Sequence, residues 1–523
     1  MIDLSIINNK FKQTMMHKEF IYHPRDFRKI ELWKNVKDEE WYNPQWQLKN
    51  SIRSVDQLKH VIKLNDYQEQ EIRRVVDELE RQGKDPLRIT PYYASLMDED
   101  PFHPDIPLEE KGNKRLDPIF WQSVPTPANL LFPNTGREAS MNEGSRSYGA
   151  AYQRYPNRVA LFVAQNTSCA SYCVHCQRAK SLDAMCDVNI ELINKGLFYI
   201  NFNKNIDEVL VTGGDALRVS KKRLQYVLEE LSKMEHIRAI RIATRVPVVL
   251  PMAVTDEILT LIKESANRYT KGQEKYVYFM THVNHYKEIT ADFAAAIKRI
   301  NSYGFTVRKQ TVFLNHVNDY FVTLAKTFRR MFWVGVHPYY LLQCHKEKGI
   351  VHFISPIQVG QIYMKHMQGW LSGIVRPNYA VNIEGGGGKV LLMPLNYDNL
   401  NIDLKIEDKI SESKAKVYTW DDKEIFDYEA LGRATPDEYN KALRIMDKFI
   451  GRKGVFVPKI ILIDNNGNYI ETTNRTKLPT FEKQKKAVLL GYETNQSGMP
   501  ITNPAKISKK LDELYQKSTF SKK

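Results

Sequence analysis

The sequence predicts an α/β fold in which a parallel sheet curls into a partial (β/α)6 barrel, preceded by a helical region and followed by an extension. From residue 159 onward, short apolar runs alternate with amphipathic segments such as SKKRLQYVLEELSKM and TADFAAAIKRINSYG. This alternation indicates βαβ units and a parallel sheet. About six such units follow one another, which is enough for the sheet to curl. The expected strands are 159–164, 208–212, 237–243, 276–281, 306–314 and 334–342.

The chain divides into five segments around this array. Residues 1–115 are polar and helix-patterned, as in QEQEIRRVVDELERQG, and residues 116–158 form a connector with proline and glycine that leads into the barrel. Residues 159–345 form the barrel itself. Residues 346–409 carry a second glycine-rich motif, and residues 410–523 form an extension. We expect this extension to be separable from the rest of the fold.

Composition and charge exclude several classes of protein. The longest apolar runs, such as VALFVA, are far too short to cross a bilayer, and the first residues lack the pattern of a signal peptide. Five cysteines in 523 residues argue against a disulfide framework and favour a reducing, cytoplasmic setting. The net charge of +15 (76 − 61) is spread widely, so we expect a solvated basic surface and no nucleic-acid partner.

Three of the cysteines lie close together, in the spacing Cys169-x3-Cys173-x2-Cys176, directly after the first expected strand. Structural zinc needs four ligands, so a zinc site would recruit His175 or a distant residue. Three unligated thiols in an exposed loop would oxidise readily. A [4Fe–4S] cluster held by three thiolates leaves one iron open to an amine and a carboxylate. The position after a barrel strand favours this cluster.

The cysteine spacing is similar to the signature of radical S-adenosylmethionine (SAM) enzymes, and the surrounding residues resemble the lysine 2,3-aminomutase family within that group. The matching motifs run in family order from about residue 40 to 397, and the resemblance implies that the helical region and the barrel form one unit. The motifs are WQLKNSIRSVDQLKHVIKL at 46–64, RITPYYASLMD at 88–98, RYPNRV at 154–159, VTGGDAL at 211–217, IATRVPVVLP at 242–251, THVNHYKEIT at 281–290, HPYYLLQC at 337–344 and GGGGKVLLMP at 385–394.

Two of these motifs are candidates for binding SAM. Gly213, Gly214 and Asp215 follow the second expected strand, and glycines there allow close approach of the backbone to a ligand. A lone GGD is more often a simple turn, but the resemblance assigns this turn to the methionyl amine of SAM. His282 follows the fourth expected strand and resembles the family's SAM-contacting histidine; the alternative is a structural histidine.

The motif GGGGK ends in Lys389. From the sequence alone, a mobile hairpin with a surface lysine and a lysine that binds pyridoxal phosphate (PLP) covalently are equally good interpretations. The resemblance assigns Lys389 to PLP. It also assigns Arg154, Tyr155 and Arg158 to the PLP phosphate, since arginine suits phosphate well. The alternative for these three residues is an ordinary basic loop before a strand.

The residues that match the family's substrate pocket differ from its lysine-specific members. Arg178 matches the arginine that pairs with the substrate carboxylate, with a surface ion pair as the alternative. Lysine-specific members place two aspartates on the distal ammonium of the substrate, where this chain has His345 and Asn382. Glutamate-type members have a lysine and an asparagine, and Lys346 is adjacent here. The chain also lacks cysteines after Cys344, where lysine-type members bind zinc between subunits.

The resemblance therefore implies a radical SAM, PLP-dependent 2,3-aminomutase that moves the amino group of a glutamate-like or other polar L-α-amino acid from C2 to C3. It implies a [4Fe–4S] cluster, SAM and PLP as cofactors, an electron donor such as flavodoxin or ferredoxin, and a homo-oligomer. One alternative is an enzyme of the same family that acts on lysine or on another amino-acid-derived substrate. Another is a non-catalytic iron–sulfur scaffold, against which the intact Cys169, Cys173, Cys176, Arg178 and Lys389 argue.

Overall fold

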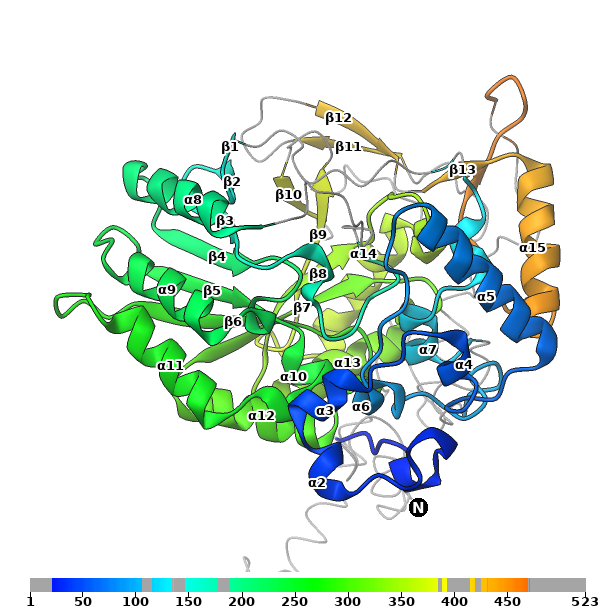
Figure 1. Ribbon diagram of the computed structural model, residues 1–523. Helices are drawn as coiled ribbons and strands as arrows, with labels where there is room; N and C mark the ends of the chain where they lie inside the picture. The colour runs from blue at the N-terminus through cyan, green and yellow to red at the C-terminus, as the bar shows by residue number, and fades with distance from the viewer. Residues whose placement is uncertain are drawn as a thin grey trace, which may run out of the picture. The chain divides into compact units, whose positions relative to one another are not determined.

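The main element of the fold is a sheet of ten strands in the order β1 to β10, seen in the computed structural model in Figure 1. Within the described part of the chain, every helix is too short or too polar to span a bilayer. The structure describes residues 21–105, 115–133, 135, 146–176, 188–383, 388–392, 414–418, 425–429, 431–468 and 470.

The middle of the sheet is parallel, as the alternating pattern predicts. All six expected strands are present with small shifts at their ends, and β9 is a further parallel strand that the sequence analysis did not predict. Antiparallel strands flank this parallel part on both sides. The parallel strands are β3 (Arg158–Phe162), β4 (Glu208–Thr212), β5 (Ala239–Ala243), β6 (Tyr276–His282), β7 (Thr306–Phe313), β8 (His337–Gln343) and β9 (Asn378–Ile383). The flanking strands are β1 (Arg146–Tyr148), β2 (Ala151–Tyr155) and β10 (Gly388–Leu391).

Helices alternate with these strands and cover the outer face of the sheet (Figure 1). The longer helices have one buried face; in α9, for example, Ser220 caps the first turn and the buried side chains recur at helical spacing, at Leu224, Leu228 and Leu231. The helices are α8 (Ile190–Phe202), α9 (Lys221–Ser232), α10 (Val246–Val249), α11 (Asp256–Asn267), α12 (Ala291–Ser302), α13 (Phe321–Trp333) and α14 (Ile357–Trp370).

Side chains join the two ends of the sheet. Arg154 on β2 donates from Nη1 to Oδ1 of Asn382 on β9, at 2.6 Å. The backbone N–H of Lys389 on β10 donates to the hydroxyl of Tyr155 on β2, at 2.7 Å. These contacts join residues more than 200 positions apart in the chain. The sheet therefore curls into a barrel, which confirms the predicted fold class.

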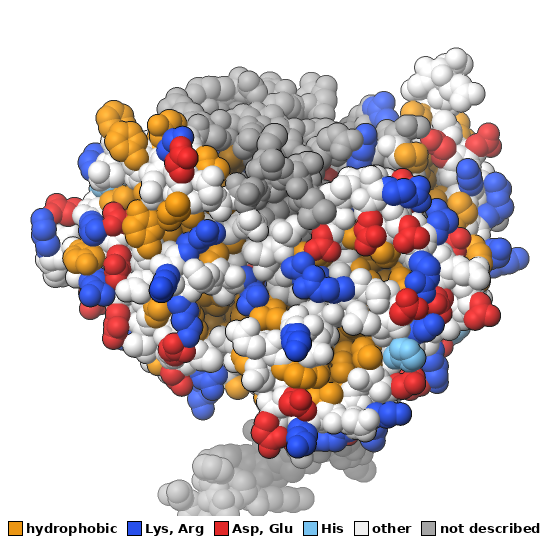
Figure 2. All heavy atoms as spheres, viewed as in Figure 1, with side chains coloured by type: hydrophobic (Ala, Val, Ile, Leu, Met, Phe, Trp, Pro, Cys, Tyr) orange, Lys and Arg blue, Asp and Glu red, His pale blue; other side chains and the backbone are white. Residues whose placement is uncertain are grey.

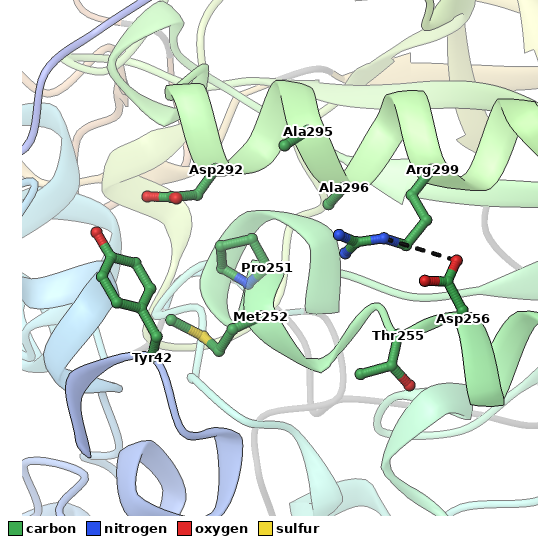
Figure 3. Close-up of a pocket in the computed structure, with 9 residues that line it drawn as sticks. All are labelled: Tyr42, Pro251, Met252, Thr255, Asp256, Asp292, Ala295, Ala296 and Arg299. Carbon is green, nitrogen blue, oxygen red and sulfur yellow. Dashed lines mark ion pairs between the residues drawn. The ribbon is translucent and has the colours of Figure 1, made fainter. Parts of the chain in front are cut away.

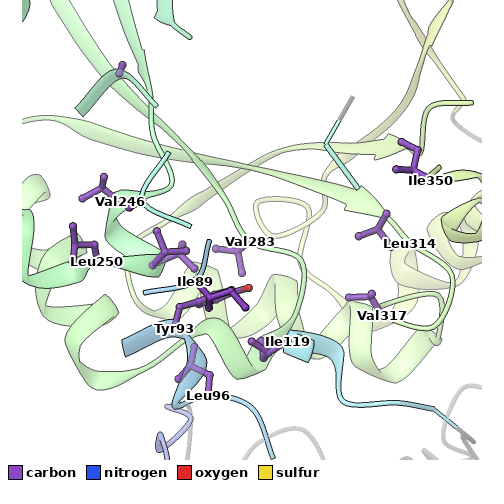
Figure 4. Close-up of a cluster of buried hydrophobic side chains, with 14 of the residues drawn as sticks. Ile89, Tyr93, Leu96, Ile119, Val246, Leu250, Val283, Leu314, Val317 and Ile350 are labelled. Carbon is purple, nitrogen blue, oxygen red and sulfur yellow. The ribbon is translucent and has the colours of Figure 1, made fainter. Parts of the chain in front are cut away.

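The N-terminal helical region, which in the structure extends through α7 to Ser123, packs on the loops that follow the central strands. Figure 4 shows Tyr93 and Ile119 of this region among Val246, Val283 and Leu314, which follow β5, β6 and β7; all five are buried. The region thus covers the carboxyl ends of the strands, where the loops of an α/β barrel build its site. Its helices are α2 (Asp38–Trp41), α3 (Pro44–Lys49), α4 (Val55–Leu58), α5 (Asp66–Arg81), α6 (Pro91–Ala94) and α7 (Pro118–Ser123).

The segment 431–470 packs on the helical region, so we expect it to fold with the rest of the chain and not as the separable extension that the sequence suggests. Its helix α15 (Pro436–Ile450) buries Met446 and Phe449. The ring of Phe449 meets that of Phe102 edge-on at 5.4 Å, and Gln68 donates to the carbonyl of Phe449 at 3.0 Å. An amphipathic helix must bury its apolar stripe, and here that stripe packs on the helical region. The other strands are β11 (Lys414–Tyr418), β12 (Ile425–Glu429), β13 (Arg433–Ala434) and β14 (Ile461–Leu462).

We expect Phe449→Ala to lower the free energy of unfolding of the whole protein by about 3–5 kcal/mol, because it leaves a cavity between α15 and the helical region. Urea unfolding, monitored by circular dichroism, measures the change. Lys441→Ala, at an exposed position of the same helix, is the matched control and should have little effect. Equal stabilities of the Phe449→Ala variant and the parent would show that the segment does fold separately.

Basic and acidic side chains are interspersed on the face of the molecule in Figure 2. Several of them form ion pairs between neighbouring turns of a helix, such as Arg74 with Glu71 at 2.9 Å and Lys233 with Glu230 at 2.6 Å. Pairs of this kind are typical of a solvated surface and contribute little to stability. The charge on the described part of this face is therefore mixed rather than gathered in one basic patch.

Candidate active site

The three clustered cysteines lie in the loop after β3, and their thiols are partly exposed. A turn joins two of them, since the N–H of Cys176 donates to the carbonyl of Cys173 at 3.1 Å. The helical region fixes the loop from the other side, which explains why the matching motifs extend into both regions. The contacts run from Tyr172 N–H to the Arg88 carbonyl (2.7 Å), from Val174 N–H to the Gln122 carbonyl (2.9 Å), and from Thr90 N–H to Ser171 Oγ (2.9 Å).

A buried arginine that the sequence analysis missed reaches this loop. Arg245, directly after β5, donates from Nη1 to Sγ of Cys173 at 2.7 Å. Its Nη2 donates to Glu288 and to the hydroxyl of Tyr93, each at 2.6 Å. Its position in the sequence could have identified it, because a charged residue that follows the carboxyl end of a barrel strand is expected to face the site.

His282, at the end of β6, lies beside the same loop. Cys173, His175 and His282 bring their potential ligand atoms within 4.8 Å of one another. Burial lowers the pKa of His282 to about 4, so its ring is neutral near pH 7. The structure thus brings one cysteine and two histidines together, and these three residues are the candidate ligands of the zinc alternative.

Hydrogen bonds to Asn284 argue against a zinc ion at these three residues. The N–H of Val312 can only donate, so it fixes Asn284 Oδ1 as an acceptor (2.9 Å) and leaves Asn284 Nδ2 as a donor. Nδ2 donates to Nε2 of His175 at 3.2 Å. The proton of the neutral His175 ring is then on Nδ1, and neither nitrogen has a lone pair free for a metal. Thiolates are the usual ligands of iron–sulfur clusters, so the donor set fits the cluster better.

The GGD turn lies between β3 and β5. A Cβ atom on Gly213 would lie 2.4 Å from the carbonyl oxygen of Ala164, so only glycine fits this close approach. Both oxygens of Asp215 accept hydrogen bonds from the protein: Oδ1 from the Thr244 hydroxyl and Oδ2 from the N–H of Arg245, each at 2.7 Å. The carboxylate of Asp215 therefore holds the end of β5 in place, and the N–H of Gly214 binds the Gln165 carbonyl at 3.1 Å.

Lys389 lies on β10, directly opposite Asn382 on β9. Burial lowers the pKa of Lys389 to about 8, with further lowering by the charges of Arg154, Arg241 and Arg158. A buried amine with a pKa near neutrality is typical of lysines that react as nucleophiles. Three of the four glycines before it, 385–387, lie outside the described residues.

Two of the arginines around Lys389 have N–H groups without a hydrogen-bond partner in the described part of the chain. Arg241 on β5 pairs with Glu208 at 2.7 Å, and the guanidinium of Arg158 stacks 3.9 Å from the ring centre of Tyr155. In the described part of the chain, the buried Nε atoms of Arg154 and Arg241 have no hydrogen-bond partner. Unpaired buried donors on neighbouring arginines fit an anionic group such as a phosphate. The sequence analysis missed Arg241, although its alternation with Ile240 and Ile242 places it on the inner face of the sheet.

The two residues of the expected substrate pocket lie at neighbouring strand ends. Leu342 on β8 is paired with Ala380 on β9, so His345 and Asn382 follow at similar heights. Nδ1 of His345 lies 3.9 Å from a carboxylate oxygen of Glu347, a neighbour that the sequence analysis did not anticipate. Arg178, expected to bind the substrate carboxylate, lies outside the described residues.

A separate cavity of about 370 Å³ lies beside α11 and α12 (Figure 3). Tyr42, Met252 and Asp292 line it, together with Asp256 and Arg299, which pair at 3.8 Å. Asp256 and Asp292 lie in the first turns of α11 and α12, where the helix dipole stabilises a carboxylate. These acidic residues therefore have a structural role, and the candidate catalytic residues lie elsewhere.

Comparisons with known proteins find similar sequences over about 70% of this chain. The L-lysine 2,3-aminomutase of Methanococcus maripaludis is 35% identical over 69% of this chain and 78% of its own length. That of Bacillus subtilis is 34% identical over 72% of this chain and 74% of its own length. The glutamate 2,3-aminomutase of Clostridioides difficile is 32% identical over 69% of this chain and 78% of its own length.

Other comparisons add little. No protein-family model matches the chain. Among solved structures, Streptococcus suis SuiB bound to S-adenosylmethionine aligns with a TM-score of 0.31 and 13% identity, over 44% of this chain and 51% of that one. This likeness is too distant to bear on the fold or the function.

Proposed function

The chain belongs to the lysine 2,3-aminomutase family, whose members are isomerases, and from this premise we propose that it is a radical SAM, PLP-dependent 2,3-aminomutase acting on a glutamate-like or other polar L-α-amino acid. The observation that carries the proposal is Lys389, a partly buried lysine whose amine has a lowered pKa among three arginines. A surface lysine in a mobile hairpin would have neither property. In this proposal the amino group moves from C2 to C3 of the substrate.

Cys169, Cys173 and Cys176 would hold a [4Fe–4S] cluster, and the GGD turn with His282 would contact SAM. When bound, these cofactors supply an electron and an organic radical that removes a hydrogen atom from the substrate. The chain supplies a cysteine loop that the helical region fixes in place. It also supplies a turn in which Gly213 packs closely against Ala164, and a neutral His282. The covering of the strand ends by buried apolar residues supports exclusion of water from the radical (Figure 4).

PLP would be bound by Lys389, with its phosphate on Tyr155, Arg158 and Arg241. Arg154 also borders this place and has a buried unpaired Nε. When bound, PLP supplies a conjugated system that stabilises an unpaired electron beside the migrating nitrogen. The lowered pKa of Lys389 supports this role, because covalent attachment of an aldehyde needs the neutral amine.

The contact between Arg154 and Asn382 supports an acidic or polar substrate. Arginine can only donate hydrogen bonds, so the Asn382 oxygen must face it, and the amide NH2 group is left to donate to a ligand. A donor suits the carboxylate of glutamate and does not suit the ammonium of lysine. An aspartate at this position would form an ion pair with Arg154 and would be a weakened partner for an ammonium.

We expect the anaerobically reconstituted protein to prefer glutamate over lysine by about a hundredfold or more, because an unpaired buried ammonium costs about 3 kcal/mol or more. The test incubates the protein with each common amino acid and identifies β-isomers by chromatographic separation followed by mass spectrometry, because substrate and product have the same mass. Replacing both His345 and Asn382 with aspartate should move the preference toward lysine. Efficient conversion of L-lysine by the parent, with glutamate inert, would show that this assignment of the pocket is wrong.

The same proposal includes the partners of the enzyme. A cluster that is reduced once per activation needs an external one-electron donor, such as a flavodoxin or a ferredoxin. An oxygen-sensitive cluster also fits a reducing, cytoplasmic setting. We propose a homo-oligomer by analogy with the family, and light scattering of the anaerobic protein tests this assembly.

A further inference from the structure

We infer that Arg245 is a positioning residue dedicated to Cys173, and that its charge raises the reduction potential of the cluster bound there. The inference rests on the proposed [4Fe–4S] cluster. It concerns a residue outside the cysteine motif, in the loop after a different strand, whose contact with the cysteine loop only the fold reveals.

The geometry makes Arg245 a fixed cation. Its guanidinium is buried, with 9% of the side chain exposed, and the Glu288 carboxylate beside it is completely buried. Glu288 is itself held by two backbone N–H groups, those of Asn284 at 2.6 Å and His285 at 2.9 Å. The backbone N–H of Arg245 is in turn held by Asp215 at 2.7 Å. Both ends of the arginine are therefore anchored, and Nη1 has a set direction toward Cys173.

This arrangement favours the reduced cluster. Uptake of one electron from the external donor makes the cluster more negative, and hydrogen bonds and positive charge at its sulfurs stabilise that state. The guanidinium lies 2.7 Å from Sγ of Cys173 in a buried site, where its interaction with added negative charge is weakly screened. Glu288 offsets part of the charge but lies on the other side of the guanidinium, bound to Nη2. The sulfur is thus nearer to the cation than to its counter-ion.

Arg245→Gln should lower the midpoint potential of the cluster. The measurement is a reductive titration of the anaerobic holoprotein, followed by electron paramagnetic resonance, and it does not depend on turnover. Arg245→Lys keeps a positive charge beside Glu288 but loses the guanidinium, which can donate to Glu288 and Cys173 at once. The midpoint potential of the cluster in this variant should therefore lie between those of the parent and the Gln variant. If the Gln variant does not fold, the midpoint potential of the Lys variant alone, compared with that of the parent, tests the inference.

Tyr93→Phe is the matched control, because it removes another member of the same buried network without changing its charge. Tyr93 contacts both Glu288 and Arg245, at 2.8 and 2.6 Å. The midpoint potential of the cluster in Tyr93→Phe should match that in the parent. Unchanged potentials in both arginine variants, or an equal shift in Tyr93→Phe, would overturn the inference. A parent protein that binds no iron would instead contradict the proposed function, so the two failures are distinguishable.

Discussion

Lys389→Ala should abolish turnover and the covalent binding of PLP together. The ε-amino group of Lys389 is the proposed attachment point, and no other group can replace a covalent bond at that position. Sodium borohydride reduction of the parent, followed by peptide mapping, should find the label on Lys389. The variant should lack the absorbance of the bound cofactor.

The matched control for this variant is Lys309→Met. Lys309 is fully buried, more so than the partly buried Lys389, and burial holds its pKa well below the usual value for lysine. Its Nζ lies 3.7 Å from the ring centre of Phe328 on α13, so it faces the outer helices and not the arginines around Lys389. Lys309→Met should retain PLP. Labelling of Lys309, or of any residue other than Lys389, would contradict the assignment.

The pKa of Lys389 also predicts how attachment depends on pH. Burial and three arginines lower this pKa from the ordinary value to about 8, so the neutral amine becomes the main form as the pH rises through 8. Incorporation of PLP into the apoprotein should therefore accelerate between about pH 7 and pH 9 and then level off. Stopped-flow absorbance measures this rate. A rate that keeps rising beyond about pH 10 would indicate an exposed lysine with an ordinary pKa.

The repeating pattern of the barrel could be predicted from the sequence, but its closure could not. Each parallel strand except β9 shows in the local alternation of apolar runs and amphipathic helices. The contact between Arg154 and Asn382 joins residues 228 positions apart, and it exists only because the sheet curls. Nothing in the local sequence around either residue indicates such a partner.

The same limit applies to the site. The cysteines, the GGD turn and Lys389 belong to short motifs, so spacing and resemblance found them. Arg241 lies just before the motif IATRVPVVLP and Arg245 lies within it, but the sequence marks neither as a site residue, because their importance depends on which neighbours the fold brings to them. The packing of the C-terminal segment could not be predicted for a related reason: the sequence of α15 is amphipathic, but its partner is a helical region more than 300 residues earlier in the chain.

The largest expected effect outside the lysine site concerns the cluster. Three thiolates hold three irons and leave the fourth open, so the anaerobic parent should bind about four irons per chain and show a spectrum that SAM perturbs. Cys173→Ala should lose the iron, the spectrum and all turnover. Cys344→Ala is the matched control: this thiol is buried and burial raises its pKa, so it lacks the thiolate character of a ligand and should not affect iron.

His175→Gln separates the cluster from the zinc alternative, which Cys173→Ala alone cannot do because both sites would use that thiol. A zinc ion between Cys173, His175 and His282 needs the imidazole as a ligand. A glutamine can keep an acceptor for Asn284 Nδ2 but is a poor zinc ligand. The cluster uses thiolates only, so this variant should retain about four irons per chain. Stoichiometric zinc without iron in the anaerobic parent, lost in His175→Gln, would replace the cluster with a zinc site and remove the basis for radical chemistry in this protein.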